Sequence, residues 1–97
     1  MLTLPPVLTH AEAPGFVQHL NQQVLAQPAE VVLDASGLKA FDSSALAVLL
    51  ECRREALAAG KAFSVQGLPA RLRQLAGLYG VQELIPPTAV GGLAATA

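Results

Sequence analysis

The stretch over residues 31–50 constrains the fold of this chain more than any other. It reads Val-Val-Leu-Asp-Ala-Ser-Gly-Leu-Lys-Ala-Phe-Asp-Ser-Ser-Ala-Leu-Ala-Val-Leu-Leu. Three consecutive apolar residues at 31–33 are typical of a strand that is covered on both faces. Asp42, Ser43 and Ser44 then supply side chains of the kind that cap free N–H groups at the start of a helix. The expected local structure is a buried strand that leads through a loop into an amphipathic helix.

The same alternation continues along the rest of the chain. Helical spacing of apolar residues predicts three helices, and shorter apolar segments predict four strands. The strands are expected over 1–4, 30–34, 61–66 and 81–85, and the helices over 14–27, 43–59 and 69–79. Because helices connect successive strands, neighbouring strands should be parallel. The sequence therefore predicts an α/β fold with a mixed, mostly parallel four-stranded sheet and three or so helices packed on it.

The expected helix over 43–59 has one apolar stripe and one polar face. The stripe consists of Leu46, Leu49, Leu50 and Leu57, and the polar face of Glu51, Arg54 and Glu55. Cys52 lies among apolar neighbours and is interpreted as a small packed hydrophobe. Gly60 is expected to end the helix in the left-handed conformation that glycine adopts readily.

Composition limits the classes of protein to which the chain can belong. Its 97 residues are enough for one core, which we assign to residues 1–87, with a flexible small-residue tail over 88–97. A net charge of −1 gives no electrostatic basis for binding nucleic acid. No apolar run reaches the roughly 18 residues of a spanning helix, and no secretory signal is recognisable. A single cysteine favours a reducing compartment, so a cytoplasmic domain is expected.

The sequence lacks the motifs of the common enzyme classes. No nucleophile elbow surrounds the serines and no phosphate-binding glycine loop is present. His10 and His19 are nine residues apart, a spacing that does not suit two metal ligands on one helical face. Asp34, at the end of a strand, is expected to order the following loop by accepting backbone N–H groups. We therefore expect a protein that is not an enzyme and that needs no cofactor or metal.

The Asp42-Ser43-Ser44 triplet offers more capping groups than one helix needs. Only one of the three residues can be the N-cap, so at least one hydroxyl remains for another role. A phosphate on Ser43 or Ser44 would add roughly 1.5–2 negative charges at the positive end of the helix. Such a change would weaken a partner fitted to a neutral hydroxyl. The triplet is thus a candidate partner-binding surface and a candidate switch.

The motifs of the central region resemble those of the STAS domain, which occurs in sulfate transporters and in anti-sigma factor antagonists. The resemblance rests on Val-Val-Leu-Asp-x-Ser-Gly-Leu at 31–38, followed by Phe-Asp-Ser-Ser-Ala-Leu at 41–46. It continues through the segment Phe-Ser-Val-Gln-Gly at 63–67 and the helix before Val81, and it covers about residues 30–87.

Two branches of the family imply different functions, and we favour the first. Resemblance to the MlaB-like subunit of the Mla phospholipid-transport system implies an accessory protein bound to an ABC ATPase and, through it, to a permease. It would then lie on the cytoplasmic side of the inner membrane, with Ser43 as the hydroxyl that matters. Resemblance to anti-sigma factor antagonists implies phosphorylation of Ser44 by a partner serine kinase. A third interpretation is a purely structural module in which the triplet is only a cap.

Overall fold

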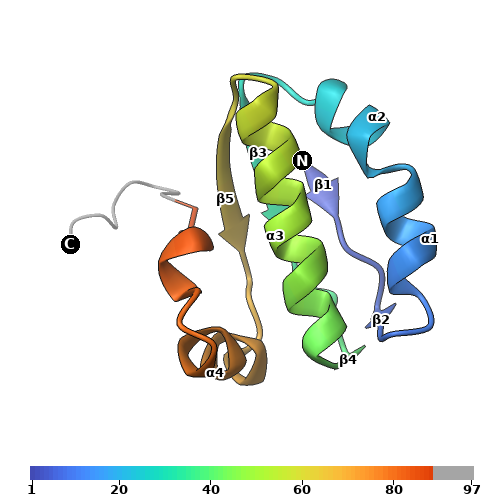
Figure 1. Ribbon diagram of the computed structural model, residues 1–97, viewed down its shortest axis with the longest axis vertical. Coiled ribbons are helices and arrows are strands. Elements are labelled where there is room, and N and C mark those ends of the chain that lie inside the picture. The colour runs from blue at the N-terminus through green and yellow to red at the C-terminus, as the bar shows by residue number, and fades with distance from the viewer. Residues whose placement is uncertain (89–97) are drawn as a thin grey trace.

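Short parallel strands alternate with helices along residues 1–88, the part of the chain that this computed structural model describes (Figure 1). The strands are β1 (Leu2–Thr3), β2 (Val7–Leu8), β3 (Glu30–Asp34), β4 (Ala40–Phe41) and β5 (Ala62–Gln66). The helices are α1 (Ala13–Gln18), α2 (Leu20–Leu25), α3 (Ser43–Ala58) and α4 (Ala70–Leu78), followed by a 3-10 turn, η1 (Gln82–Leu84). This arrangement confirms the predicted α/β fold.

All the strand pairs are parallel and fall into two sheets. The main sheet has the order β1-β3-β5, with Leu2 beside Leu33 and Val31 beside Phe63. The second sheet pairs β2 with β4 and is only two residues long on each strand. The sequence did not predict this second pair, because two-residue strands leave no periodic signal.

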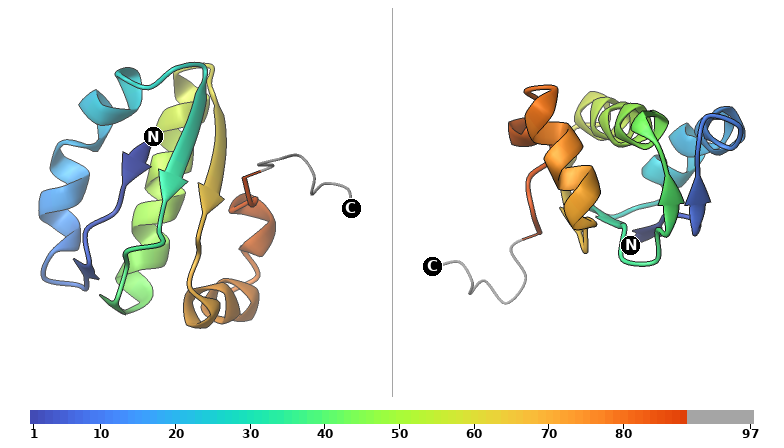
Figure 2. Two further views of the ribbon diagram at one scale, coloured as in Figure 1. Left: turned by 180° about the vertical axis from the view of Figure 1, so that it is seen from behind. Right: turned by 90° about the horizontal axis from the view of Figure 1, so that it is seen from below.

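The helices α1, α2 and α3 lie on the same side of the main sheet (Figure 2). Along β3, Val31 and Leu33 are buried toward these helices, whereas Val32 between them is only half-buried. The expectation that residues 31–33 are covered on both faces is therefore wrong. The alternation is that of a strand with one face in the core and one face partly open.

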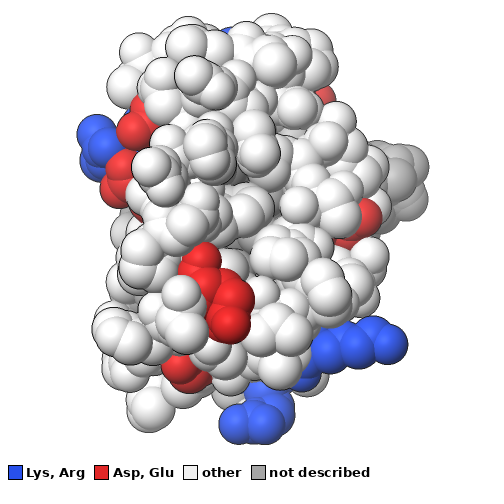
Figure 3. Space-filling model, turned by 90° about the vertical axis from the view of Figure 1, so that its right-hand side faces the viewer, with Lys and Arg blue, Asp and Glu red and all other residues white. Residues whose placement is uncertain are grey.

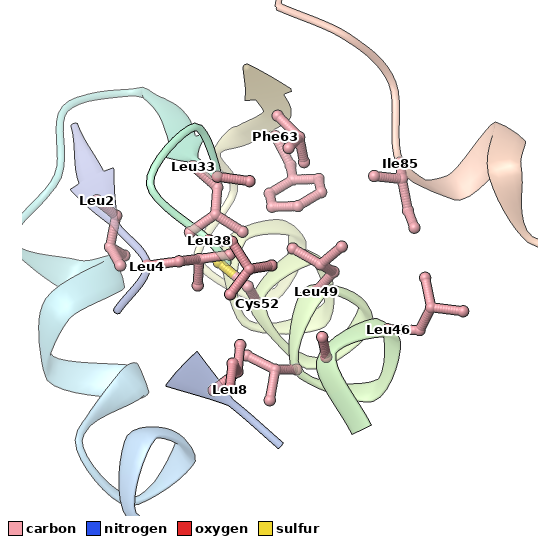
Figure 4. Packing of buried hydrophobic residues seen from close by; sticks show 14 of the residues in the cluster. Leu2, Leu4, Leu8, Leu33, Leu38, Leu46, Leu49, Cys52, Phe63 and Ile85 are labelled. Carbon is pink, nitrogen blue, oxygen red and sulfur yellow. The ribbon is translucent and has the colours of Figure 1, made fainter. Parts of the chain in front are cut away.

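The core forms where α3 crosses the main sheet. Leu33, Leu49 and Leu72 are fully buried and come from β3, α3 and α4. Figure 4 shows Leu33 and Phe63 of the sheet near Leu49 and Cys52 of α3. These side chains hold α3 in place, so they also fix the position of its two ends.

The apolar stripe predicted for α3 is correct in its first half only. Leu46 and Leu49 are buried and Leu50 is half-buried, but Leu57 is 48% exposed. Cys52 is fully buried, as expected of a packed hydrophobe, and burial raises the pKa of its thiol to about 12. The helix thus has a deeply packed N-terminal half and a more open C-terminal turn.

The helix predicted over 14–27 is instead two short helices that meet at His19. The backbone of His19 (φ −106°, ψ 4°) departs from α-helical geometry, and its N–H bonds to the Phe16 carbonyl three residues back. This bend allows α2 to bury Leu20 and Val24 while α1 takes its own direction. Apolar spacing alone does not reveal such a break.

The strand predicted over 81–85 is also wrong, because η1 occupies that segment. Pairing with β5 occurs just after it, where Pro86 O accepts the N–H of Val65 and Thr88 N donates to the Val65 carbonyl. Neither Pro86 nor Pro87 has an N–H to extend the ladder, so the contact remains a single bridge. Of the predicted tail over 88–97, only Thr88 falls within the described residues.

No helix within residues 1–88 is long and apolar enough to cross a membrane.

Candidate functional site

Asp42 lies at the N-terminus of α3 and connects the polar groups there. Its backbone is extended, and its Oδ1 accepts the N–H of Ser44 at 2.8 Å. Its Oδ2 accepts the backbone N–H of His10 at 3.0 Å, and its carbonyl accepts the N–H of Ala45. Asp42 is therefore both the N-cap of α3 and the link between this helix and a loop 32 residues earlier in the chain.

The two serines follow this cap as the first residues of α3. Ser43 is exposed, whereas Ser44 is half-buried. Because Asp42 supplies the cap, neither serine hydroxyl is needed to begin the helix. Asp42 is thus the one residue of the triplet whose side chain caps α3.

The loop beside Asp42 is positioned by the short β2–β4 pair. Val7 lies beside Ala40 and Leu8 beside Phe41, so the residues after each strand emerge at the same end. Thr9 and Glu12 close the loop, since the Glu12 carboxylate accepts both the backbone N–H and the hydroxyl of Thr9. The spacing of Thr9 and Glu12 is visible in the sequence as a capping pattern. The residues near Thr9 and Glu12 in the sequence give no indication that this turn lies next to Asp42.

The carboxylates of Asp42 and Glu12, near the start of α3, both favour the ionised form. The N–H groups of Ser44 and then His10 lower the pKa of Asp42 below its ordinary value. The hydroxyl and N–H of Thr9 lower the pKa of Glu12. Both carboxylates are thus engaged with backbone N–H groups, and the Ser43 side chain beside Asp42 is exposed.

A shallow groove of about 330 Å³ begins at this site and runs between α1 and α3. Its lining residues are His10, Ala13, Pro14 and Val17 on one side and Ser44, Ala47, Val48 and Glu51 on the other. Ser44 thus contributes to the groove, whereas Ser43 does not. Sequence reasoning missed this groove because it depends on how α1 packs against α3.

Arg54 of α3 and Arg71 of α4 make different kinds of contact. Arg54 pairs with Glu51 and Glu55 on the predicted polar face of α3. Arg71 of α4 lies over the ring of Phe41, 5.9 Å from its centroid, a distance at which a cation–π contact is favourable. Since Phe41 directly precedes Asp42, α4 approaches the site from the side opposite to α1 (Figure 1).

Other sequence-based candidates lie apart from the triplet or serve local structure. Asp34 accepts the N–H and hydroxyl of Ser36 at 3.0 and 2.7 Å, so it orders its loop as expected. His19 is exposed at the junction of α1 and α2, nine residues after His10 in the sequence. Among residues 1–88, no group of three or more His, Cys, Asp or Glu side chains is placed to hold a metal ion.

A second and larger hollow, of about 480 Å³, lies away from the triplet. It is formed at the end of β5 together with α4 and η1, and its lining includes Val65, Leu68, Arg73 and Ile85. The Arg73 guanidinium donates to the Leu68 carbonyl at 3.4 Å. None of the three triplet residues contributes to this hollow.

Comparison with known proteins connects this geometry to a family. The sequence model of a family described as "Mlab, STAS domain" matches residues 1–86. The structure is similar to the crystal structure of a candidate anti-sigma factor antagonist from Thermotoga maritima, with a TM-score of 0.74. That alignment covers 94% of this chain and 81% of the other, at 15% sequence identity, so it establishes likeness of fold alone. A search of curated proteins found no match.

Proposed function

This chain belongs to the family of MlaB-type STAS domains, and from that premise we propose that it is a non-catalytic accessory subunit. Its partner would be the ATPase of an ABC-type phospholipid (Mla) transporter, whose assembly and ATP hydrolysis it would support. It would act on the cytoplasmic side of the inner membrane, held there by the ATPase and its permease. The proposal extends the family assignment to a particular partner.

The proposal rests on the different roles of Asp42 and Ser43 at the start of α3. The Asp42 carboxylate has both oxygens bonded to backbone N–H groups, so it is engaged in structure. Ser43 is exposed on the first turn of α3 and is not required as a cap. A neutral hydroxyl at a rigid helix start can exchange hydrogen bonds with a partner without any cost of ordering the chain.

Affinity purification of the tagged chain from its native host tests the proposal directly. We expect an ABC ATPase and its permease to co-purify, with Ser43 and Ser44 unmodified in the mass spectrum. Recovery of neither protein under conditions that keep membrane complexes intact would refute the transport assignment.

Substitution of Ser43 then tests the residue. Ser43→Ala should lower the stimulation of ATP hydrolysis in the purified complex, while the free energy of unfolding changes by less than about 0.5 kcal/mol because the side chain is exposed. Ser43→Thr keeps the hydroxyl and should restore activity. If Ser43→Ala stimulates the ATPase as well as the unaltered chain does, Ser43 has no role in the contact.

A second candidate function is an anti-sigma factor antagonist switched by phosphorylation. It is favoured by Ser44, whose hydroxyl is half-buried in the first turn of α3 at the mouth of the groove. A phosphate there would be tolerated by the helix N-terminus but would change the charge that a partner meets. Phosphate on Ser44 in cells, together with capture of a serine kinase that binds a sigma factor, would support this function and contradict the first.

A further inference from the structure

The groove between α1 and α3 has apolar walls along most of its length. Ala13, Pro14 and Val17 of α1 face Ala47 and Val48 of α3 across it. Ala47 is exposed, so part of this apolar surface is in contact with solvent. Apolar surface in a concave site is the usual receptor for an apolar side chain of a partner.

The rim of the groove is acidic. Glu51 lines the groove, and Asp42 and Glu12 adjoin it: Asp42 accepts the N–H of the lining residue His10, and Glu12 directly precedes the lining residue Ala13. Glu55 follows one turn beyond Glu51 on α3, where its side chain accepts a hydrogen bond from Asn21 of α2 at 2.6 Å. These are four of the seven Asp and Glu residues of the chain. Arg54, paired with Glu51 and Glu55, balances only one of them.

Two of the six basic residues lie on the other side of α3. Arg71 and Arg73 belong to α4, which packs against α3 away from α1 (Figure 1). Figure 3 shows acidic groups on the α1 and α2 side of the molecule, with most of the basic groups toward the edges of that view. The charged side chains next to the groove are mostly acidic, with Arg54 as the basic exception.

We propose that the groove between α1 and α3 receives an amphipathic helix of the partner protein, with apolar residues on one face and Lys or Arg along its margins. This inference rests on the proposed function, because it names the segment that the partner would insert beside the triplet. The lining residues of α3 run from Ser44 to Glu51, about 10 Å or two helical turns. A helix of that length matches the helix-in-groove mode of recognition.

The charge of the rim argues against other occupants. An anionic lipid surface or a nucleic acid would be repelled by the carboxylates of Glu12, Asp42 and Glu51. The pKa values of all three are lowered by hydrogen bonds, so the repulsion persists at neutral pH. A basic partner gains both association rate and specificity from the same charges.

Charge substitution at Ala47 tests the proposal in the purified complex. Ala47→Arg places a positive charge in the groove, Ala47→Glu adds comparable bulk with a negative charge, and Ala58→Arg is an exposed control on the same helix. We expect Ala47→Arg to weaken binding of the ATPase at least about tenfold more than Ala47→Glu, with Ala58→Arg close to the unaltered chain. Equal losses for both Ala47 variants, or no loss, would overturn the proposal.

A second measurement does not depend on the identity of the partner. Two model 18-residue helical peptides, one of Leu and Lys and one of Leu and Glu, are titrated into the isotope-labelled chain. We expect the basic peptide to shift the amide resonances of His10, Val17 and Ala47 in NMR spectra, and the acidic peptide to leave them unchanged. Shifts confined to α4, or self-association of the free chain that Ala47→Arg abolishes, would contradict the assigned occupant. If the basic peptide binds in the groove but no ATPase is recovered from the host, the proposed transport function fails and the groove assignment stands.

Discussion

At its C-terminal end α3 is closed by its own backbone, whereas at its N-terminal end it depends on a side chain and on a distant loop. Gly60, at φ +74°, donates to the Leu57 carbonyl, and Lys61 donates to the Ala56 carbonyl. This is the pair of bonds that defines a Schellman motif. Lys61 also donates through Nζ to the carbonyls of Val24 and Leu25, which fastens the end of α2 to the same corner.

At the N-terminal end of α3, by contrast, a polar side chain remains exposed. Asp42 bonds to Ser44 within the helix and to His10 outside it, and Ser43 remains exposed. One end of this helix therefore has its polar groups used within the fold, while the other end keeps an exposed hydroxyl, where we propose that the partner binds. Substitutions that act on one end or on both can therefore separate stability from recognition.

The largest effect is expected in the middle of α3, where both ends depend on the same packing. Leu49 is fully buried, so Leu49→Ala should lower the free energy of unfolding by about 2–5 kcal/mol through the lost contacts and the cavity left behind. Leu57→Ala, at an exposed position of the same helix, should cost less than about 1 kcal/mol. Urea denaturation followed by circular dichroism measures both. Similar values for the two variants would contradict the assignment of the core.

A smaller effect is expected at the closed end. Gly60→Ala should lower the free energy of unfolding by about 1 kcal/mol, because alanine is strained at positive φ although no atom blocks its Cβ. Gly37, where the backbone is not left-handed and the space is open, provides the control, and Gly37→Ala should not destabilise the fold. Binding of the partner should be unchanged in both variants. A loss of binding in Gly60→Ala at a temperature where it is folded would show that the closed end also takes part in recognition.

The features that the sequence could predict are those that depend on residues close together in the chain. Features that depend on residues far apart in the chain could not be predicted. The end of α3 at Gly60 and the capping triplet at residues 42–44 depend on neighbours in the chain, so their roles could be read from spacing. The contact between Asp42 and His10 requires the β2–β4 pair, and two-residue strands have no periodic pattern. The sequence therefore predicts the triplet at the start of α3, but not the loop and the groove that lie beside it.

The wrong predictions have a related cause. Residues 81–85 have the apolar content of a strand, but the prolines at 86 and 87 withhold the N–H groups that would extend a ladder. Leu57 fits the helical stripe in spacing, yet no element of the described structure covers the last turn of α3 well enough to bury it. In both cases the local pattern is present, but the hydrogen bonds of a ladder in one case and the covering side chains in the other do not form.

The smallest effect on stability is expected from lowering the pH, and it should be the most selective for the N-terminal end of α3. The pKa of Asp42 is lower in the folded state than its ordinary value of 3.8, so its carboxylate stabilises the fold fully above that pH. The stabilisation is lost as the pH falls from 3.8 through the lower folded pKa. Asp42→Asn should therefore be less stable than the unaltered chain at neutral pH, and the gap should close in acid.

Melting temperatures of the two proteins between about pH 6 and pH 2.5 measure this gap, and Asp34→Asn serves as a control with its own lowered pKa. The amide resonances of His10 and Ser44 should move with the titration of Asp42, since both N–H groups donate to its carboxylate. Those of Gly60 and Lys61 should not, because only carbonyl groups accept their backbone N–H groups. A constant difference in melting temperature across this range would mean that the cap acts through its shape alone, and the two ends of α3 would then differ less than their hydrogen bonds indicate.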